Sequence, residues 1–365
     1  MSKKILCYCS WNGYGHIARA YSLAKFIDNV EIIICSPQPY IFPLKKNVRY
    51  VNMTEPQSRY RFEGEKIVRQ EYHDTIDVES YRKHVLEFFK LLDEIHPDLV
   101  IVDNPAEIAI YSMLMGYRTL IVYETLKSND LRWRLSWGNV ERVIVPYTKE
   151  FSEEIDYRFA DNSFFSGGYS RFEADELPNR IATRKELDIK DSEKLCLITM
   201  GKARLGEKII PEIIKSVVNN KSIKVLMPYF AEDDWINGLK KKFPELMVIH
   251  NQTDLRKFYV AADLVLTGAG YNSVMECFEF RVPAILFPLD RVYGEQSNKA
   301  VVTKKMGAAE IINVNQTGWS SKIKPLINKV LEPKNTNKMK RAQAKIVDGQ
   351  GARRLANYIT QLIEV

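Results

Sequence analysis

Short apolar runs alternate with longer amphipathic segments along most of this chain, and this alternation restricts the folds it can adopt. Several runs are uninterrupted Ile, Leu and Val, which is typical of strands buried on both faces of a parallel sheet. The segments between them, such as 17–28 and 80–95, have the spacing of helices. Strand–helix alternation predicts parallel sheets covered by helices. The predicted strands are 4–10, 30–36, 97–103, 118–124, 142–147, 194–200, 223–228, 246–250, 263–268, 283–288 and 308–313.

The predicted strands form two series, separated by a stretch rich in glycine, serine and charge. A length of 365 residues also suggests two domains, at roughly 150 residues each. We expect an α/β protein with two doubly wound domains, in which a polar, aromatic stretch over 55–80 forms a loop region. The expected parts are an N-terminal domain over 1–168, a connection over 169–193, a C-terminal domain over 194–345, and a helix over 346–365 that packs back on the N-terminal domain.

Composition excludes several classes of protein. Hydrophobic residues make up 45% and charged residues 27% of the chain, as in soluble globular proteins. No apolar run approaches the roughly 18 residues that span a bilayer. Five cysteines without framework spacing do not indicate a disulfide scaffold or a zinc site. We expect a cytoplasmic protein, either free or at the inner face of the membrane.

The positive charge is concentrated in the C-terminal half. Residues 1–170 carry 21 basic and 23 acidic side chains, whereas residues 171–365 carry 32 and 23. Such an excess attracts an anionic ligand, or forms a solvated basic face. No recognised nucleic-acid-binding motif accompanies it, so no nucleic-acid partner is expected. The stretch 126–143, with Trp133 and Trp137 among arginines, suits a membrane interface, a sugar-polymer acceptor or an ordinary helix.

A glycine-rich turn in the second half carries the most information about a ligand. An apolar strand runs into Gly268 and Gly270, and a helix is predicted to begin near Asn272 or Ser273. Glycines let the backbone approach a ligand closely, and the helix N-terminus offers free N–H groups to an anion. Glu276 follows one turn later, where a carboxylate can accept hydrogen bonds from ribose hydroxyls.

An acid and an amide, Glu295 and Gln296, follow a proline-bearing strand end and a loop containing Gly294. Together they supply the acceptors and donors that sugar hydroxyls need. The glycine turn, taken alone, also fits an ordinary tight turn between a strand and a helix, and each polar residue alone fits a solvated helix position.

Residues 263–312 resemble the donor-binding half of GT-B glycosyltransferases. The nearest pattern is that of the family that includes the transferase making lipid II and the UDP-glucuronosyl and glucosyl transferases. The chain departs from it at Arg281, where the family usually has Gly, and in placing Asn298 one position early. The resemblance implies two Rossmann-like domains facing across a cleft. The matching residues are Gly270, Ser273, Glu276, Pro283, Glu295, Gln296, Asn298, Gly307 and Ala308.

The N-terminal segment SWNGYGHIARA resembles the Gly-x-Gly-His-x-x-Arg turn of a branch of the same superfamily. It contains Gly13, Gly15, His16 and Arg19, with Arg19 either binding an anionic group or lying on the surface. His16 follows the first strand and has a side chain suited to take a proton from an acceptor hydroxyl. Asp103 ends another strand; the resemblance implies that it orients His16, and helix capping is the alternative.

The resemblance implies donor contacts from Gly268, Gly270 and the polar residues after them. The family's second donor-side loop is replaced here by Met200, Gly201 and Lys202, and Lys202 is expected near the diphosphate. No Asp-x-Asp pair occurs in the chain, so no metal is expected, and helix ends and basic side chains would neutralise the diphosphate instead.

The sequence therefore predicts an inverting, metal-independent glycosyltransferase without a cofactor. The donor would be a nucleotide sugar, UDP first and dTDP second, and the acceptor an unknown hydroxyl on a glycan, lipid or small molecule. One alternative is a UDP-sugar hydrolase of the pseudaminic-acid-pathway type, whose similar turn would use His16 to activate water. Another is a binding protein without catalysis.

Overall fold

The computed structural model describes residues 3–11, 13–56, 78–123, 131–152, 161–200, 206–218, 220–229, 233–289 and 294–364. Within them, thirteen strands make up two sheets. The first sheet contains β1 (Lys4–Cys9), β2 (Glu31–Ser36), β3 (Val48–Asn52), β4 (Leu99–Asp103), β5 (Thr119–Val122), β6 (Arg142–Val145) and β7 (Ser163–Phe165). The second contains β8 (Lys194–Ile198), β9 (Ile223–Tyr229), β10 (Leu246–His250), β11 (Leu264–Gly268), β12 (Ala284–Phe287) and β13 (Glu310–Ile311).

Helices connect these strands and cover both sheets. In the described residues they are α1 (Gly15–Ala24), α2 (Val78–Ile95), α3 (Ala106–Leu114), α4 (Leu131–Asn139), α5 (Arg180–Glu186), α6 (Gly206–Val218), α7 (Asp234–Lys242), α8 (Arg256–Ala261), α9 (Tyr271–Glu279), α10 (Glu295–Lys305), α11 (Ile323–Leu331), α12 (Pro333–Ile346) and α13 (Gly351–Glu364).

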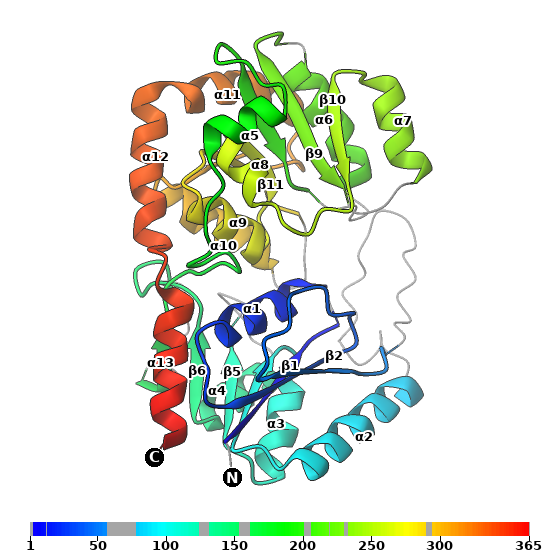
Figure 1. Cartoon of the computed structure of the whole chain (residues 1–365), viewed down its shortest axis with the longest axis vertical. Coiled ribbons are helices and arrows are strands. Elements are labelled where there is room, and N and C mark those ends of the chain that lie inside the picture. The colour runs from blue at the N-terminus through cyan, green and yellow to red at the C-terminus, as the bar shows by residue number, and fades with distance from the viewer. Residues whose placement is uncertain are drawn as a thin grey trace.

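Each sheet is parallel throughout the described residues and doubly wound (Figure 1). The strand orders are β3-β2-β1-β4-β5-β6-β7 and β10-β9-β8-β11-β12-β13. In both, the first strand of the series lies inside the sheet and the strand order reverses beside it. Ligands of open α/β sheets bind at such a switch point, beyond the carboxyl ends of the strands. The predicted fold class is therefore confirmed.

Two strands were missing from the prediction, and both lie at an edge of the first sheet. Strand β3 reads Val-Arg-Tyr-Val-Asn, with an exposed arginine at its second position, and pairs only with β2. Strand β7 has three half-buried residues and pairs with β6. An edge strand is not buried on both faces, so neither one shows the uninterrupted apolar run that identified the others.

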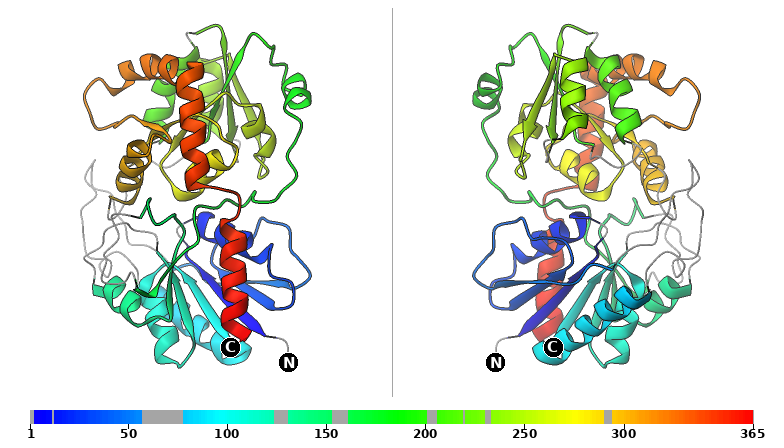
Figure 2. Two further views of the ribbon diagram at one scale, coloured as in Figure 1. Left: turned by 90° about the vertical axis from the view of Figure 1, so that its left-hand side faces the viewer. Right: turned by 90° about the vertical axis from the view of Figure 1, so that its right-hand side faces the viewer.

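The first sheet is covered on one face by α1 and α13, which bury Ile17, Leu355 and Ile359 against it. Helices α2, α3 and α4 cover the other face. Figure 2 shows α12 beside the second sheet and α13 beside the first, so the end of the chain crosses from one half to the other. The crossing lies beside Gly168, whose N–H donates to the carbonyl of Ile346 at 3.0 Å.

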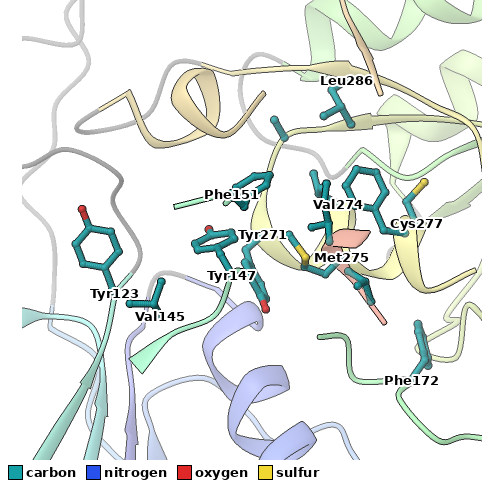
Figure 3. Packing of buried hydrophobic residues seen from close by; sticks show 14 of the residues in the cluster. Tyr123, Val145, Tyr147, Phe151, Phe172, Tyr271, Val274, Met275, Cys277 and Leu286 are labelled. Carbon is teal, nitrogen blue, oxygen red and sulfur yellow. The ribbon is translucent and has the colours of Figure 1, made fainter. Parts of the chain in front are cut away.

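The second sheet packs against α6, α7 and α11 on one face and against α8 and α9 on the other. The apolar core on this other face continues into the first half. Tyr147 and Phe151, which follow β6, stack on each other, and the ring of Tyr147 meets the ring of Tyr271 edge-on (Figure 3). The two halves thus share one continuous buried cluster.

Part of the predicted connection 169–193 packs on the second half instead of only linking the two halves. Asn179 caps α5 by accepting a hydrogen bond from the N–H of Ala182 at 3.0 Å, and α5 packs against α8 of the second half. Most of the predicted loop over 55–80 lies outside the described residues.

Candidate active site

His16 and Asp103 meet at the carboxyl edge of the first sheet. Strands β1 and β4 are neighbours, with Cys9 paired to Asp103, so the turn after β1 lies beside the end of β4. The Nδ1 atom of His16 lies 3.1 Å from Oδ1 of Asp103, and both side chains are buried. The structure thus brings together the two residues predicted as base and orienting acid.

Arg19 completes this cluster from the next turn of α1. Its Nε donates to Oδ2 of Asp103 and its Nη2 to Oδ1, both at 2.7 Å, and Nη2 also lies 3.0 Å from Nδ1 of His16. The predicted alternative of a surface residue is wrong, because Arg19 is 4% exposed. A separation of three residues along a helix places the side chains of His16 and Arg19 on the same face.

The charge of Arg19 determines the ionisation of Asp103. Burial raises the pKa of this carboxyl, but the positive charges of Arg19 and His16 and their hydrogen bonds outweigh that effect and lower the pKa to about 2. Asp103 is therefore a carboxylate at neutral pH, and it holds the guanidinium of Arg19 through both of its oxygens.

The glycine turn of the second half lies at the carboxyl end of β11, inside its sheet. Helix α9 starts at Tyr271, and Gly270 caps it in extended conformation without a side-chain hydrogen bond to the first N–H groups. A Cβ atom at Gly270 would meet no described atom within 4 Å, and one at Gly268 would first meet Oε1 of Gln296 at 3.8 Å. The first turn, with Asn272 and Ser273, thus offers N–H groups to an anion.

Glu276 lies one turn further along α9 and is buried. Its Oε1 accepts a hydrogen bond from Nε of Arg171 at 2.8 Å, and Tyr259 donates to its Oε2 at 3.3 Å. Arg171 was not predicted as a partner of Glu276, and it lies in the predicted connection, 105 residues earlier in the chain. A ribose that used Glu276 would have to share it with Arg171 or displace it.

Glu295 and Gln296, the acid and the amide predicted to bind the sugar, begin helix α10. Gln296 is buried, and its Oε1 accepts a hydrogen bond from the N–H of Leu289 at 3.0 Å, which leaves its amide N–H groups as donors for a ligand. Glu295 forms an ion pair with Lys299, four residues later on the same helix. Lys299 is 0% exposed and was missed in the sequence, although the Glu-to-Lys spacing of four is a recognisable signal.

The turns of the two halves touch each other. A Cβ atom on Gly15 would overlap the side-chain nitrogen of Asn272, so the start of α1 lies directly against the start of α9. The guanidinium of Arg19 lies 5.1 Å from the ring centroid of Tyr271, and Nζ of Lys299 lies 5.8 Å from the same centroid. Tyr271, also missed in the sequence, thus links the candidate base cluster to the candidate donor site.

The remaining predicted site residues are placed as follows. Gly13 has a positive φ of 117°, which favours glycine, and a Cβ there would meet no described atom within 4 Å. Gly201 and Lys202 lie outside the described residues.

Of the three interpretations of the stretch 126–143, the structure favours an ordinary helix for its tryptophans, because neither Trp133 nor Trp137 lies at the surface. Both rings are buried in the core of the first half, 5.5 Å apart between centroids. Throughout the described ranges, no helix combines the length and apolarity needed to cross a bilayer. The same part of the chain contains no group of His, Cys, Asp and Glu that is arranged to hold a metal ion.

Comparisons with known proteins find glycosyltransferases similar to this chain. Residues 214–357 match the glycosyltransferase family 28 C-terminal domain. The chain is 25% identical over 191 residues to an uncharacterized glycosyltransferase of Methanopyrus kandleri, and this match spans about half the length of each chain (52%). It is 24% identical over 290 residues, 77% of each chain, to the Clostridium botulinum UDP-N-acetylglucosamine–N-acetylmuramyl-(pentapeptide) pyrophosphoryl-undecaprenol N-acetylglucosamine transferase.

The fold also matches solved structures along its whole length. Phytolacca americana UGT2, in complex with UDP-2fluoro-glucose and pterostilbene, superposes with a TM-score of 0.71 over 100% of both chains at 12% sequence identity. The fold is that of the GT-B glycosyltransferase structures, and the donor-side half resembles the donor-binding half of glycosyltransferases. The match to the family 28 C-terminal domain includes α9, β12 and α10, which carry the donor-side residues.

Proposed function

We propose that this protein transfers a sugar from a nucleoside-diphosphate donor, preferably a UDP-sugar, to a hydroxyl acceptor with inversion at the anomeric carbon. The observation that carries the proposal is the contact between the His16–Asp103–Arg19 cluster and the first turn of α9. A proton acceptor and an anion-binding helix N-terminus are thereby brought to the same place from two halves of the chain.

The C-terminal half supplies the donor contacts in this proposal. The N–H groups at the start of α9 face the diphosphate, and Glu276 accepts hydrogen bonds from the ribose hydroxyls. Glu295 and Gln296 provide an acceptor and a donor for the hydroxyls of the sugar. The Clostridium botulinum relative is named for a UDP-N-acetylglucosamine donor, and UGT2 is complexed with a UDP-sugar analogue, which supports UDP as the nucleotide.

The N-terminal half supplies the base. The acceptor hydroxyl gives its proton to Nε2 of His16 while its oxygen attacks the anomeric carbon from the face opposite the diphosphate. The bond from that carbon to the diphosphate oxygen breaks, and its electron pair leaves with the nucleotide. Asp103 orients the imidazole and stabilises the imidazolium that forms, because its carboxylate stays ionised.

Nucleotide release from a panel of UDP- and dTDP-sugars, with and without a cell extract as acceptor source, tests the proposal. A metal-independent transferase is supported if nucleotide release requires the extract and persists in EDTA. The rate of release should also fall about 10²- to 10⁴-fold in His16→Ala. Rapid release without acceptor that depends on His16 would instead show a hydrolase. An unchanged turnover number in His16→Ala would contradict the assignment of the base.

A further inference from the structure

Arg19 contacts the candidate base, the orienting acid and the donor helix together. Its guanidinium hydrogen-bonds both oxygens of Asp103, approaches Nδ1 of His16 and lies over the ring of Tyr271. The N–H donors of arginine are held in a rigid planar group. A movement of the guanidinium that changes one of these contacts therefore changes the others as well.

The Nδ1 atom of His16 lies between a donor and an acceptor. Nη2 of Arg19 is 3.0 Å away, and Oδ1 of Asp103 is 3.1 Å away. In a neutral imidazole this nitrogen either carries the proton and donates to Asp103, or carries a lone pair and accepts from Arg19. The position of this proton decides whether Nε2 can act as a base, because Nε2 has a lone pair only when the proton is on Nδ1.

Asp103 is a weakened acceptor for His16 in the present arrangement. Both of its oxygens already accept hydrogen bonds of 2.7 Å from Arg19, shorter than the contact to His16. A hydrogen bond from Nη2 to Nδ1 therefore competes well, and it places the imidazole proton on Nε2. In that tautomer His16 cannot accept a proton from a hydroxyl through Nε2.

Tyr271 connects this choice to the donor site. It is the first residue of α9, and its hydroxyl is fixed on both sides: it accepts from the N–H of Tyr169 and donates to the carbonyl of Tyr169, each at 3.2 Å. Lys299, the partner of Glu295, lies over the same ring. An anion at the first turn of α9 attracts both cations and alters how Arg19 sits on the ring.

We propose that Arg19 is a positioning residue through which a nucleotide bound at α9 sets the tautomer of His16. Without nucleotide, Arg19 donates to Nδ1 and the proton stays on Nε2. With nucleotide, Arg19 turns from Nδ1 toward Tyr271 and the anion, Nδ1–H donates to Asp103, and Nε2 becomes the base. The inference rests on the proposed function, and it adds that the base is active only when the donor site is occupied.

The test follows the two imidazole nitrogens of His16 by ¹⁵N NMR, with and without UDP, the His16→Gln spectrum supplying the assignment. UDP affinity is measured by calorimetry on the same samples. Wild type is expected to change from the Nε2–H to the Nδ1–H tautomer as UDP saturates. Tyr271→Phe keeps the ring face and is expected to respond like wild type.

Tyr271→Leu removes the ring, and it is expected to bind UDP within about threefold of wild type while its His16 tautomer no longer responds. Its kcat for nucleotide release should fall at least tenfold with little change in KM. A tautomer that ignores UDP in wild type, or one that still responds in Tyr271→Leu, overturns the inference and leaves the proposed function standing. Failure of wild type to bind UDP or a UDP-sugar would remove the proposed function itself, and the inference with it.

Discussion

Gly15 at the start of α1 and Asn272 at the start of α9 lie so close that position 15 has no room for a side chain unless Asn272 moves. This contact joins the two halves of the molecule at the point where one carries the candidate base and the other the candidate diphosphate site. The requirement for glycine at position 15 comes from the partner half, not from the local backbone, since Gly15 has no positive φ.

Gly15→Ala is expected to weaken UDP binding about three- to tenfold while changing stability by less than about 1 kcal/mol. The new methyl group displaces the side-chain amide of Asn272, which can turn aside, and alanine suits a helix better than glycine. Calorimetric titration and urea unfolding measure the two effects. Gly238→Ala in α7, where a Cβ meets nothing within 4 Å, is the matched control. Equal affinities in the two variants would contradict this role for the contact.

Asp103→Asn is expected to destabilise the protein by about 3–5 kcal/mol at pH 7, because it leaves Arg19 buried without a counter-charge. The pKa of Asp103 is lowered to about 2 in the folded protein. Its ionic contribution is therefore complete above about pH 4 and is lost as the pH falls toward 2, so wild type and variant should converge over this range. Urea unfolding between pH 3 and pH 7 measures the difference.

Asp28→Asn, which removes an exposed partner of Lys45, is the control for that series and should cost less than about 1 kcal/mol at every pH. A constant difference between Asp103→Asn and wild type down to pH 3 would show that the carboxylate charge is not what stabilises the cluster.

Glu279→Gln is expected to stabilise the protein above neutral pH. Burial and the negative charge of Glu173 raise the pKa of Glu279 to about 7, and among the described residues its Oε2 has no hydrogen-bond partner. Because the folded state holds this proton more tightly than the unfolded state, wild-type stability falls as the pH rises from about 4.5 to 7. Glu279→Gln has no ionisable group at this position, so its stability does not fall in this way over that pH range.

At pH 8 the gain of Glu279→Gln over wild type should reach at most about 3 kcal/mol, and it should vanish near pH 4. Thermal unfolding at both pH values measures it, with Glu245→Gln, an exposed carboxyl, as the control. A gain of the same size at pH 4 would point to packing, not ionisation, as the cause.

Arg171→Gln is expected to tighten UDP binding about three- to tenfold. The substitution releases Glu276 from its ion pair and leaves the carboxylate to the ribose hydroxyls. Calorimetry with UDP measures the change, and Arg142→Gln, at an exposed position of β6, controls for the loss of one positive charge. Weaker binding in Arg171→Gln would mean that Arg171 itself contacts the nucleotide or holds Glu276 in its binding orientation.

The sequence predicted the parallel sheets well because central strands such as β4 and β11 are buried on both faces and read as unbroken apolar runs. It also placed His16 and Asp103 at the same sheet edge, since the carboxyl ends of neighbouring parallel strands coincide. It could not predict Arg171 on Glu276, because that pair joins residues 105 positions apart through the crossing between the halves.

The role of Arg19 was ambiguous in the sequence for a related reason. Its spacing from His16 defines a helix face but not what that face meets, and Tyr271 approaches it from the other half of the molecule. The same holds for Lys299. Its ion pair with Glu295 can be predicted from their spacing in the sequence, whereas its complete burial depends on tertiary packing around α10.

The return of α13 to the first sheet has a consequence for synthesis of the chain. The face of that sheet that α1 covers only in part is completed by Leu355, Ile359 and Ile363, which leave the ribosome after the whole second half. Until then the N-terminal half exposes an apolar surface, a condition that favours aggregation or chaperone binding during translation. A fragment ending at residue 168 would keep that surface exposed permanently, so the two halves are better regarded as one cooperative folding unit than as separable modules.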